Sequence, residues 1–128
     1  MDRPTFSKRE RIVSRTLMER LFNKGESQSV SAYPLRMVYI IKERQEGEEP
    51  VEVLVSVSKR HFKRAVKRNR VKRQIREAYR HRKHLLTSRI PEGKMLAAAF
   101  IWQADDLLDS RRVDSSLGKL IEKVAERL

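Results

Sequence analysis

The residues with the most distinctive chemistry are basic side chains gathered in one internal stretch. Between Lys59 and His84 the sequence has 13 Lys or Arg and a single acid, Glu77, so this stretch carries +12 of the net charge of +13 on the 128 residues. Arginine presents a planar fork of donors that fits a phosphate group, and lysine adds a point charge. Because neutralising phosphates releases condensed counterions, a concentrated basic segment beside a nearly neutral remainder predicts a surface that binds nucleic acid.

Helical spacing within this stretch divides the side chains between two faces. One side of the helical wheel is apolar and consists of Val71, Ile75, Ala78 and Leu86, with Tyr79 at its edge. The opposite side carries what we call the arginine ridge, which consists of Asn69, Arg73, Arg76 and Arg80. The spacing predicts an amphipathic helix, which argues against a disordered basic tail. The spacing does not decide where between Lys63 and Arg68 this helix begins.

Two polar residues of this helix each have two interpretations. Asn69 can donate and accept hydrogen bonds in contact with RNA, or it can cap the start of the helix. For Glu77, an ion pair with Arg73 one turn away is favoured over a catalytic role.

No side-chain pattern typical of a protein active site is visible. The chain has no cysteine, which excludes thiolate metal sites and cysteine nucleophiles. Its three histidines, His61, His81 and His84, lie in the basic stretch without an obvious carboxylate partner. His81 and His84 are three residues apart, but a metal site would need a third ligand. We therefore predict no catalytic residue and no metal ion held by the chain alone.

A short helix is predicted before the first strand. Residues 16–24 have apolar side chains at helical spacing, with Thr16 or Ser14 as the cap and Gly25 as the end. A Ser-rich connection then leads to Pro34.

Three strands and a second peripheral helix complete the predicted elements. Strands are expected at 35–41, 51–58 and 95–102, and a helix at 117–128 after a cap within 114–116. The continuous apolar run of the last strand favours a central place in the sheet. The eight-residue loop between the first two strands favours their antiparallel pairing.

The order helix, strands, helix, strand, helix predicts an α+β fold, a two-layer α/β sandwich in which helices cover one small sheet. The length suits a single domain over residues 1–128, with residues 1–13 as a flexible N-terminal segment. No apolar run is long enough to span a membrane and no signal peptide is visible. We therefore expect a cytoplasmic protein with no membrane partner.

A motif that joins a strand to the basic helix resembles a known family. The strand ends in Ser56-Val57-Ser58-Lys59-Arg60, and the helix carries Arg68-Asn69-Arg70 followed by Lys72, Arg73, Arg76 and Glu77. This combination resembles the protein subunit of bacterial ribonuclease P, with Arg60 in place of the usual lysine. The resemblance implies the ribosomal S5 domain 2-like fold with a mixed sheet. It also implies a left-handed βαβ crossover, against the general right-handed preference.

Two RNA-binding surfaces are implied by the same resemblance. The first docks on the catalytic RNA and comprises Lys59, Arg60, Lys63, Arg68, Asn69, Arg70, Lys72, Arg73, Arg76 and Arg80. The second is a cleft between the first helix and the exposed sheet face that binds the single-stranded 5′ leader of precursor tRNA, and it comprises Met18, Phe22, Met37 and Tyr39. Such side chains stack on unpaired bases. Met18 stands where the family usually has phenylalanine, and for Met37 and Tyr39 the alternative is a closed core.

The resemblance implies a subunit of an endoribonuclease whose chemistry lies in RNA. The RNA subunit and the substrate are expected to hold Mg²⁺ and to carry out hydrolysis, with no cofactor bound by the protein alone. The implied partners are the catalytic RNA, with one protein per RNA, and precursor tRNA. A ribosomal or ribosome-associated structural protein is the alternative. A duplex-DNA binder ranks third, because evenly spaced arginines suit a backbone better than base edges, so no DNA partner is expected.

Overall fold

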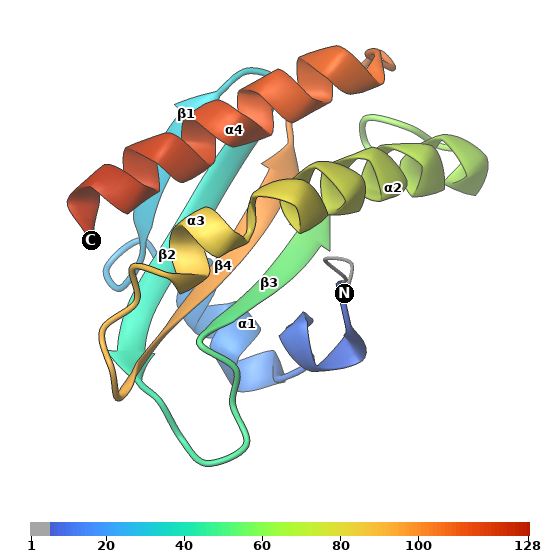
Figure 1. Ribbon diagram of the computed structural model, residues 1–128. Helices are drawn as coiled ribbons and strands as arrows, with labels where there is room; N and C mark the ends of the chain where they lie inside the picture. Colours follow the sequence, from blue (N-terminus) through green and yellow to red (C-terminus); the bar gives the residue numbers. More distant parts are fainter. Residues whose placement is uncertain (1–5) are drawn as a thin grey trace.

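A four-stranded mixed sheet runs through the centre of the computed structural model, which describes residues 6–128 (Figure 1). Its strands are β1 (Gln28–Ala32), β2 (Leu35–Glu43), β3 (Val51–Ser56) and β4 (Lys94–Trp102). They lie in the order β1-β2-β4-β3, with β1, β2 and β4 antiparallel in turn and β3 parallel to β4. The central place of β4 confirms the prediction. The predicted antiparallel pairing of β2 with β3 is wrong, because β4 lies between them.

The edge strand β1 occupies part of the stretch that the sequence predicted as a connection. It pairs with β2 so that Val30 lies opposite Met37. Val30 is the buried residue of the strand, while the serines on either side of it are exposed. A short strand with only one β-branched apolar residue and no aromatic one has little of the composition that marks strands in a sequence.

The helices lie on both faces of the sheet (Figure 1). One face is covered by α2 (Ala65–Arg82), the short α3 (His84–Thr87) and α4 (Ser110–Arg127), while α1 (Arg15–Leu21) packs against the other. Ser14 is the cap of α1, because its hydroxyl accepts from the Leu17 N–H at 3.3 Å. α4 begins well before the predicted 117, because the Asp109 carboxylate accepts from the Arg112 N–H at 2.9 Å.

β3, α2 and β4 form a βαβ unit whose two strands are parallel neighbours. In Figure 1 both strands run upward, α2 lies in front of the sheet, and β4 lies to the left of β3. The crossover is therefore left-handed. This confirms what the resemblance implied and departs from the usual hand of such units.

Both faces of the sheet are buried, each by a different set of alternate residues. The face toward α2 and α4 carries Leu35, Met37 and Tyr39 of β2 with Phe100 and Trp102 of β4. The face toward α1 carries Val38 and Ile40 of β2 with Ala97 and Ala99 of β4, and Leu17 and Leu21 of α1 cover it. Removal of these two apolar surfaces from water supplies most of the driving force for folding.

The described part of the N-terminal segment, residues 6–13, contacts the body of the protein, and its expected flexibility stays a prediction. A 3₁₀ turn (Lys8–Glu10) is followed by Arg11, which forms a parallel bridge with Val53 of β3. The buried Ile12 donates its N–H to the Val53 carbonyl at 3.0 Å. Both carboxylate oxygens of Glu10 accept from Lys83 Nζ at 2.9 Å. Residues 1–5 of the expected segment lie outside the described residues.

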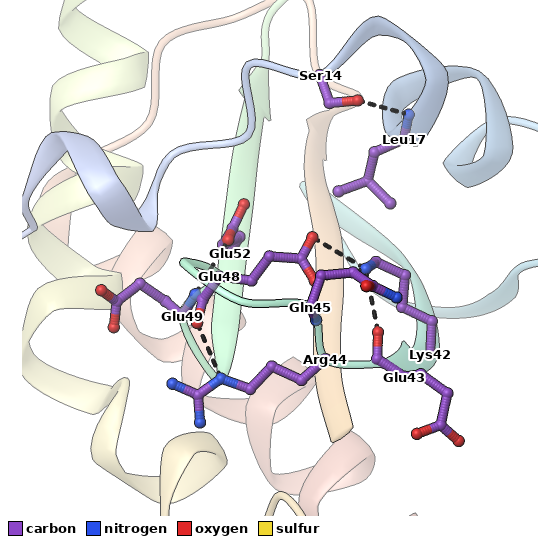
Figure 2. A network of polar contacts seen from close by, with 9 residues as sticks. All are labelled: Ser14, Leu17, Lys42, Glu43, Arg44, Gln45, Glu48, Glu49 and Glu52. Carbon is purple, nitrogen blue, oxygen red and sulfur yellow. Dashed lines mark hydrogen bonds and ion pairs between the residues drawn. The ribbon is translucent and has the colours of Figure 1, made fainter. Parts of the chain in front are cut away.

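The loop between β2 and β3 is organised around one carboxylate (Figure 2). Glu48 accepts from Lys42 Nζ at 2.7 and 2.9 Å and from the Gln45 N–H at 2.7 Å, and its carbonyl accepts from Arg44 Nε at 2.8 Å. Burial alone would raise the pKa of Glu48, but the hydrogen bonds from Lys42 and Gln45 and the nearby positive charges together lower it.

Across residues 6–128, no helix combines the length and the apolar character needed to cross a bilayer.

Candidate RNA-binding surfaces

The outer face of α2 brings the arginine ridge together. The inner face is fixed by the buried side chains of Val71, Ile75, Ala78 and Tyr79. The four ridge residues Asn69, Arg73, Arg76 and Arg80 consequently point outward and line one open depression of about 420 Å³. The amphipathic helix predicted from the sequence is therefore present, and it begins at Ala65.

The positive charge of this surface is largely unneutralised. Across residues 6–128, no carboxylate forms an ion pair with Arg70, Lys72, Arg73 or Arg76. Glu77 does not pair with Arg73 as predicted. It contacts Arg80 Nη2 at 2.5 Å and His81 Nε2 at 3.0 Å. The hydrogen bond from Arg80 is the main cause of the lowered pKa of Glu77, and this carboxylate lines the depression while it contacts Arg80 and His81.

Asn69 is not the cap of the helix, because α2 begins at Ala65 and Arg64 occupies the capping position. The Asn69 side chain is exposed, lines the depression and has no hydrogen-bond partner among residues 6–128. Its amide is therefore free to donate to or accept from a ligand.

Arg68 differs from the other cations of the predicted docking surface. Its Nη1 donates to the carbonyl oxygens of Phe62 at 2.8 Å and Lys63 at 2.9 Å. These bonds close the loop that leads into α2, so Arg68 holds the start of the helix in position.

The loop over residues 57–64 presents the remaining predicted contacts, Lys59, Arg60 and Lys63, all exposed. His61 fastens this loop to the segment after β4, because its Nδ1 lies 2.7 Å from the Asp105 carboxylate. His61 and His81 thus both have a carboxylate partner, contrary to the sequence interpretation. In the part of the chain that the structure describes, no three His, Asp or Glu side chains gather in a group suited to a metal ion.

Two of the four predicted leader contacts, Met18 and Phe22, lie within α1 and directly after it. Phe22 follows the last residue of the helix and is 51% exposed. Met18 is half-buried against the residues that α1 packs on. Both side chains accordingly lie on the side of the sheet where the cleft was predicted.

The placement of Met37 and Tyr39 in the cleft is wrong. They are 0% and 1% exposed and lie on the other face of the sheet, in the core that α2 and α4 cover. The Tyr39 hydroxyl donates to Gln28 Oε1 at 3.0 Å and accepts from Arg127 Nη1 at 3.3 Å. Because side chains alternate along a strand, the neighbours of these two residues are the ones that face α1.

A row of half-buried side chains on the α1 face was missed by the sequence analysis. Arg36 of β2 lies opposite Ile101 of β4, and Ile101 lies opposite Ser56 of β3. Leu54, also half-buried, lies one row closer to α1. Arg36 Nε donates to Ser29 Oγ at 2.9 Å. A charged residue within an otherwise apolar strand was the available signal that this set of alternate residues lies on the less covered face.

Comparison with known proteins identifies the family. A sequence model for the family Ribonuclease P matches residues 6–125. A ribonuclease P protein component of Porphyromonas gingivalis is 44% identical over 95% of this chain and 89% of its own length. One from Chlorobium phaeobacteroides is 34% identical over 68% of this chain and 60% of its own length.

Solved structures agree with this assignment at the level of the fold. A mutant RNase P protein of Staphylococcus aureus, described as defective in mRNA degradation activity, superimposes with a TM-score of 0.65 at 24% identity, covering 91% of this chain and 88% of its own. A second RNase P protein structure from that organism gives a TM-score of 0.63 at 25% identity, covering 91% and 95%. The chain therefore belongs to the family of ribonuclease P protein components.

Proposed function

We propose that this chain, as the protein subunit of ribonuclease P, supports 5′ processing of tRNA by binding the catalytic RNA through the outer face of α2. The observation that carries the proposal is the arginine ridge, in which Arg73 and Arg76 point into one depression without a carboxylate partner. Guanidinium groups held in this way fit the phosphates of a folded RNA backbone. A ribosomal structural protein is not favoured, because the relatives named above are all ribonuclease P proteins.

We further propose that the α1 side of the sheet contacts the 5′ leader of precursor tRNA. Phe22 offers an exposed ring on which an unpaired base can stack. The row of Arg36, Ile101 and Ser56 offers a cation, an apolar surface and a hydroxyl beside it. These side chains replace Met37 and Tyr39 in the proposed leader surface.

Hydrolysis is assigned to the RNA subunit. Mg²⁺ held by the RNA and the substrate would activate the attacking water and stabilise the leaving oxygen. The residues of this chain bind and orient: α2 fixes the protein on the catalytic RNA, and the α1 side holds the leader. Because only the precursor tRNA has the 5′ leader, we expect the holoenzyme to bind the precursor more tightly than the mature tRNA.

The test is cleavage of a 5′-extended precursor tRNA by a bacterial ribonuclease P RNA at low Mg²⁺, with and without the protein. We expect the protein to restore cleavage at the mature 5′ end. Arg73→Gln should weaken binding to the catalytic RNA and lower the slope of log affinity against log salt by about 0.9, the value for one lost phosphate contact. Lys119→Gln, which removes an exposed charge on α4, is the matched control. Binding without any effect on cleavage would contradict the proposal.

A further inference from the structure

An arginine outside the predicted RNA contacts also lines the depression on α2. Arg11 and Phe6, from the segment that precedes α1, form one wall of the depression that holds Asn69, Arg73 and Arg76. The segment reaches this position because its backbone pairs with β3 beside the helix. The depression is thus built by two parts of the chain that are far apart in sequence.

Arg11 is held in place by contacts that leave its charge unneutralised. Its guanidinium lies over the Phe6 ring, 5.0 Å from the ring centre. The Phe6 ring in turn packs edge-on against Tyr79, with the ring centres 5.6 Å apart. A cation–π contact orders a guanidinium while its hydrogen-bond donors stay available. No carboxylate in residues 6–128 forms an ion pair with Arg11.

Arg76 completes the site from the helix. Its Nε is buried and has no hydrogen-bond partner among the residues described. Burial, and then the positive charge of Arg11, lower the pKa of Arg76. Glu77 also lines this depression, but its carboxylate contacts Arg80 and His81, and the Glu10 carboxylate contacts Lys83. Like charges that line one depression repel each other, and an anion bound between them relieves this repulsion.

The site continues toward the α1 side of the sheet. A second, smaller depression of about 180 Å³ shares Phe6, Arg11 and Arg76 with the first. Its other walls are residues 53–55 of β3 together with Ile12 and Val13, and Val13 is the last residue but one before α1. Arg11 therefore lies where a strand of RNA that passes from the α2 surface to the α1 side would cross the edge of β3.

We propose that Arg11 and Arg76 together bind one phosphodiester group of an RNA strand that crosses this edge. The inference rests on the proposed function, since it assumes that RNA occupies the α2 surface. The phosphodiester can belong to the catalytic RNA or to the 5′ leader, and the experiment separates these two sources.

The main variant is Arg11→Gln, and Arg9→Gln is its matched control. Both substitutions remove one positive charge from the same segment. Arg9 is 73% exposed on its side chain, pairs with Glu49 at 3.3 Å and does not line either depression. The backbone bridge of Arg11 to Val53 does not depend on its side chain. Equal melting temperatures of the two variants in one buffer establish that any difference in binding is local.

Two measurements locate the phosphodiester. The first is affinity for a bacterial ribonuclease P RNA across a salt series, and the second is affinity of the reconstituted holoenzyme for precursor and for mature tRNA. If the group belongs to the catalytic RNA, Arg11→Gln weakens binding about tenfold and lowers the salt slope by about 0.9 in the first measurement. If it belongs to the leader, precursor binding falls about tenfold while mature tRNA binding is unchanged. Arg11→Gln behaving as Arg9→Gln in both measurements overturns the inference.

A double-mutant cycle tests whether the two arginines share one group. We expect the loss for Arg11→Gln with Arg76→Gln to be clearly smaller than the product of the two single losses, because each single change already disrupts the shared contact. Independent losses that multiply would overturn the shared site. The failure of the proposed function gives a different result. If the proposed function is wrong, the unaltered protein does not change cleavage. If only this inference is wrong, the unaltered protein still stimulates cleavage, and Arg11→Gln changes neither RNA affinity nor tRNA affinity.

Discussion

At the scale of single residues, Tyr39 and Phe22 illustrate two different roles for aromatic side chains in this fold. Tyr39 is enclosed beneath α4 with its hydroxyl between Gln28 and Arg127, so its ring contributes to the core. Phe22 has half of its surface in contact with solvent at the end of α1. A ring in the first position stabilises the protein, and a ring in the second can meet an RNA base.

Tyr39→Ala should therefore change stability and not leader recognition. We expect the free energy of unfolding, measured by urea denaturation, to fall by about 3 kcal/mol or more, because the substitution leaves a cavity in the main core. Tyr39→Phe, which removes the two hydroxyl hydrogen bonds, should cost about 1 kcal/mol. Selective loss of precursor binding by a Tyr39→Ala protein of normal stability would show that the burial described here is wrong.

Phe22→Ala should have the opposite effect. We expect a change in unfolding free energy within about 1 kcal/mol. Because one base stack is lost, affinity of the holoenzyme for precursor tRNA should fall by about 1–3 kcal/mol, with mature tRNA unaffected. Tyr33→Ala is the matched control, since Tyr33 is 60% exposed but lies beside α4, where Ser116 Oγ donates to its carbonyl. Equal losses for precursor and mature tRNA would count against the leader surface.

The alternation of β2 explains why these roles could not all be assigned from the sequence. Alternation along the strand divides its side chains into two sets, one with Met37 and Tyr39 and the other with Arg36 and Val38. Both sets are mostly apolar because helices cover both faces, so the pattern does not say which set faces α1. The ridge on α2 was predictable because a helix with one apolar stripe has only one way to bury it.

At the scale of elements, the loop between β2 and β3 is where charge supports local structure. The Glu48 carboxylate accepts hydrogen bonds from the Lys42 ammonium and the Gln45 N–H, and these contacts connect the end of β2 to the loop (Figure 2). The sequence indicated only an eight-residue loop at this place. The conformation of the loop depends on which of its glutamates pairs with Lys42, and the composition of the loop does not specify this.

Glu48→Gln should destabilise the protein in a pH-dependent way. The pKa of Glu48 is lower in the folded protein than its ordinary value of 4.5, so its ionised form favours folding. This contribution is present above pH 4.5 and is lost as the pH falls through the lower folded pKa. We expect a stability difference of about 1 kcal/mol from the unaltered protein at pH 7, which shrinks on acidification in urea titrations. Glu46→Gln, at an exposed site of the same loop, should show no such difference.

Element boundaries and pairings were predicted where local signals dominate. The Ser14 cap and the apolar period of α2 are local, and the sequence contained both. The pairing of β3 with β4 brings together segments separated by α2, and a short loop after β2 pointed instead to the wrong neighbour. Strand order depends on packing across the whole sheet, so loop length alone is a weak guide.

At the scale of the whole molecule, charge is divided between regions. Nearly all of the net charge of +13 lies in and beside α2, while the remainder of the chain is close to neutral. This division could be predicted from the sequence because the basic residues lie in one stretch of the chain. The apolar face of α2 is buried, so the basic side chains of the same helix must face outward. Self-repulsion within such a region opposes the folded state, and bound anions relieve it.

Low concentrations of sulfate should consequently stabilise the isolated protein. An anion that binds the folded state raises its stability by RT ln(1 + [L]/Kd), about 1.4 kcal/mol at ten times Kd, or roughly 5 °C in the melting temperature for a chain of this size. We expect this rise between 1 and about 20 mM sulfate, where general salting effects are small, and not in chloride of equal ionic strength. Because Arg73 and Arg76 line the unneutralised depression, Arg73→Gln and Arg76→Gln should reduce the rise, whereas Lys119→Gln should preserve it. Equal effects of sulfate and chloride in all four proteins would mean that the arginine ridge screens charge without binding an anion, and the RNA contacts would then have to lie elsewhere on the basic segment.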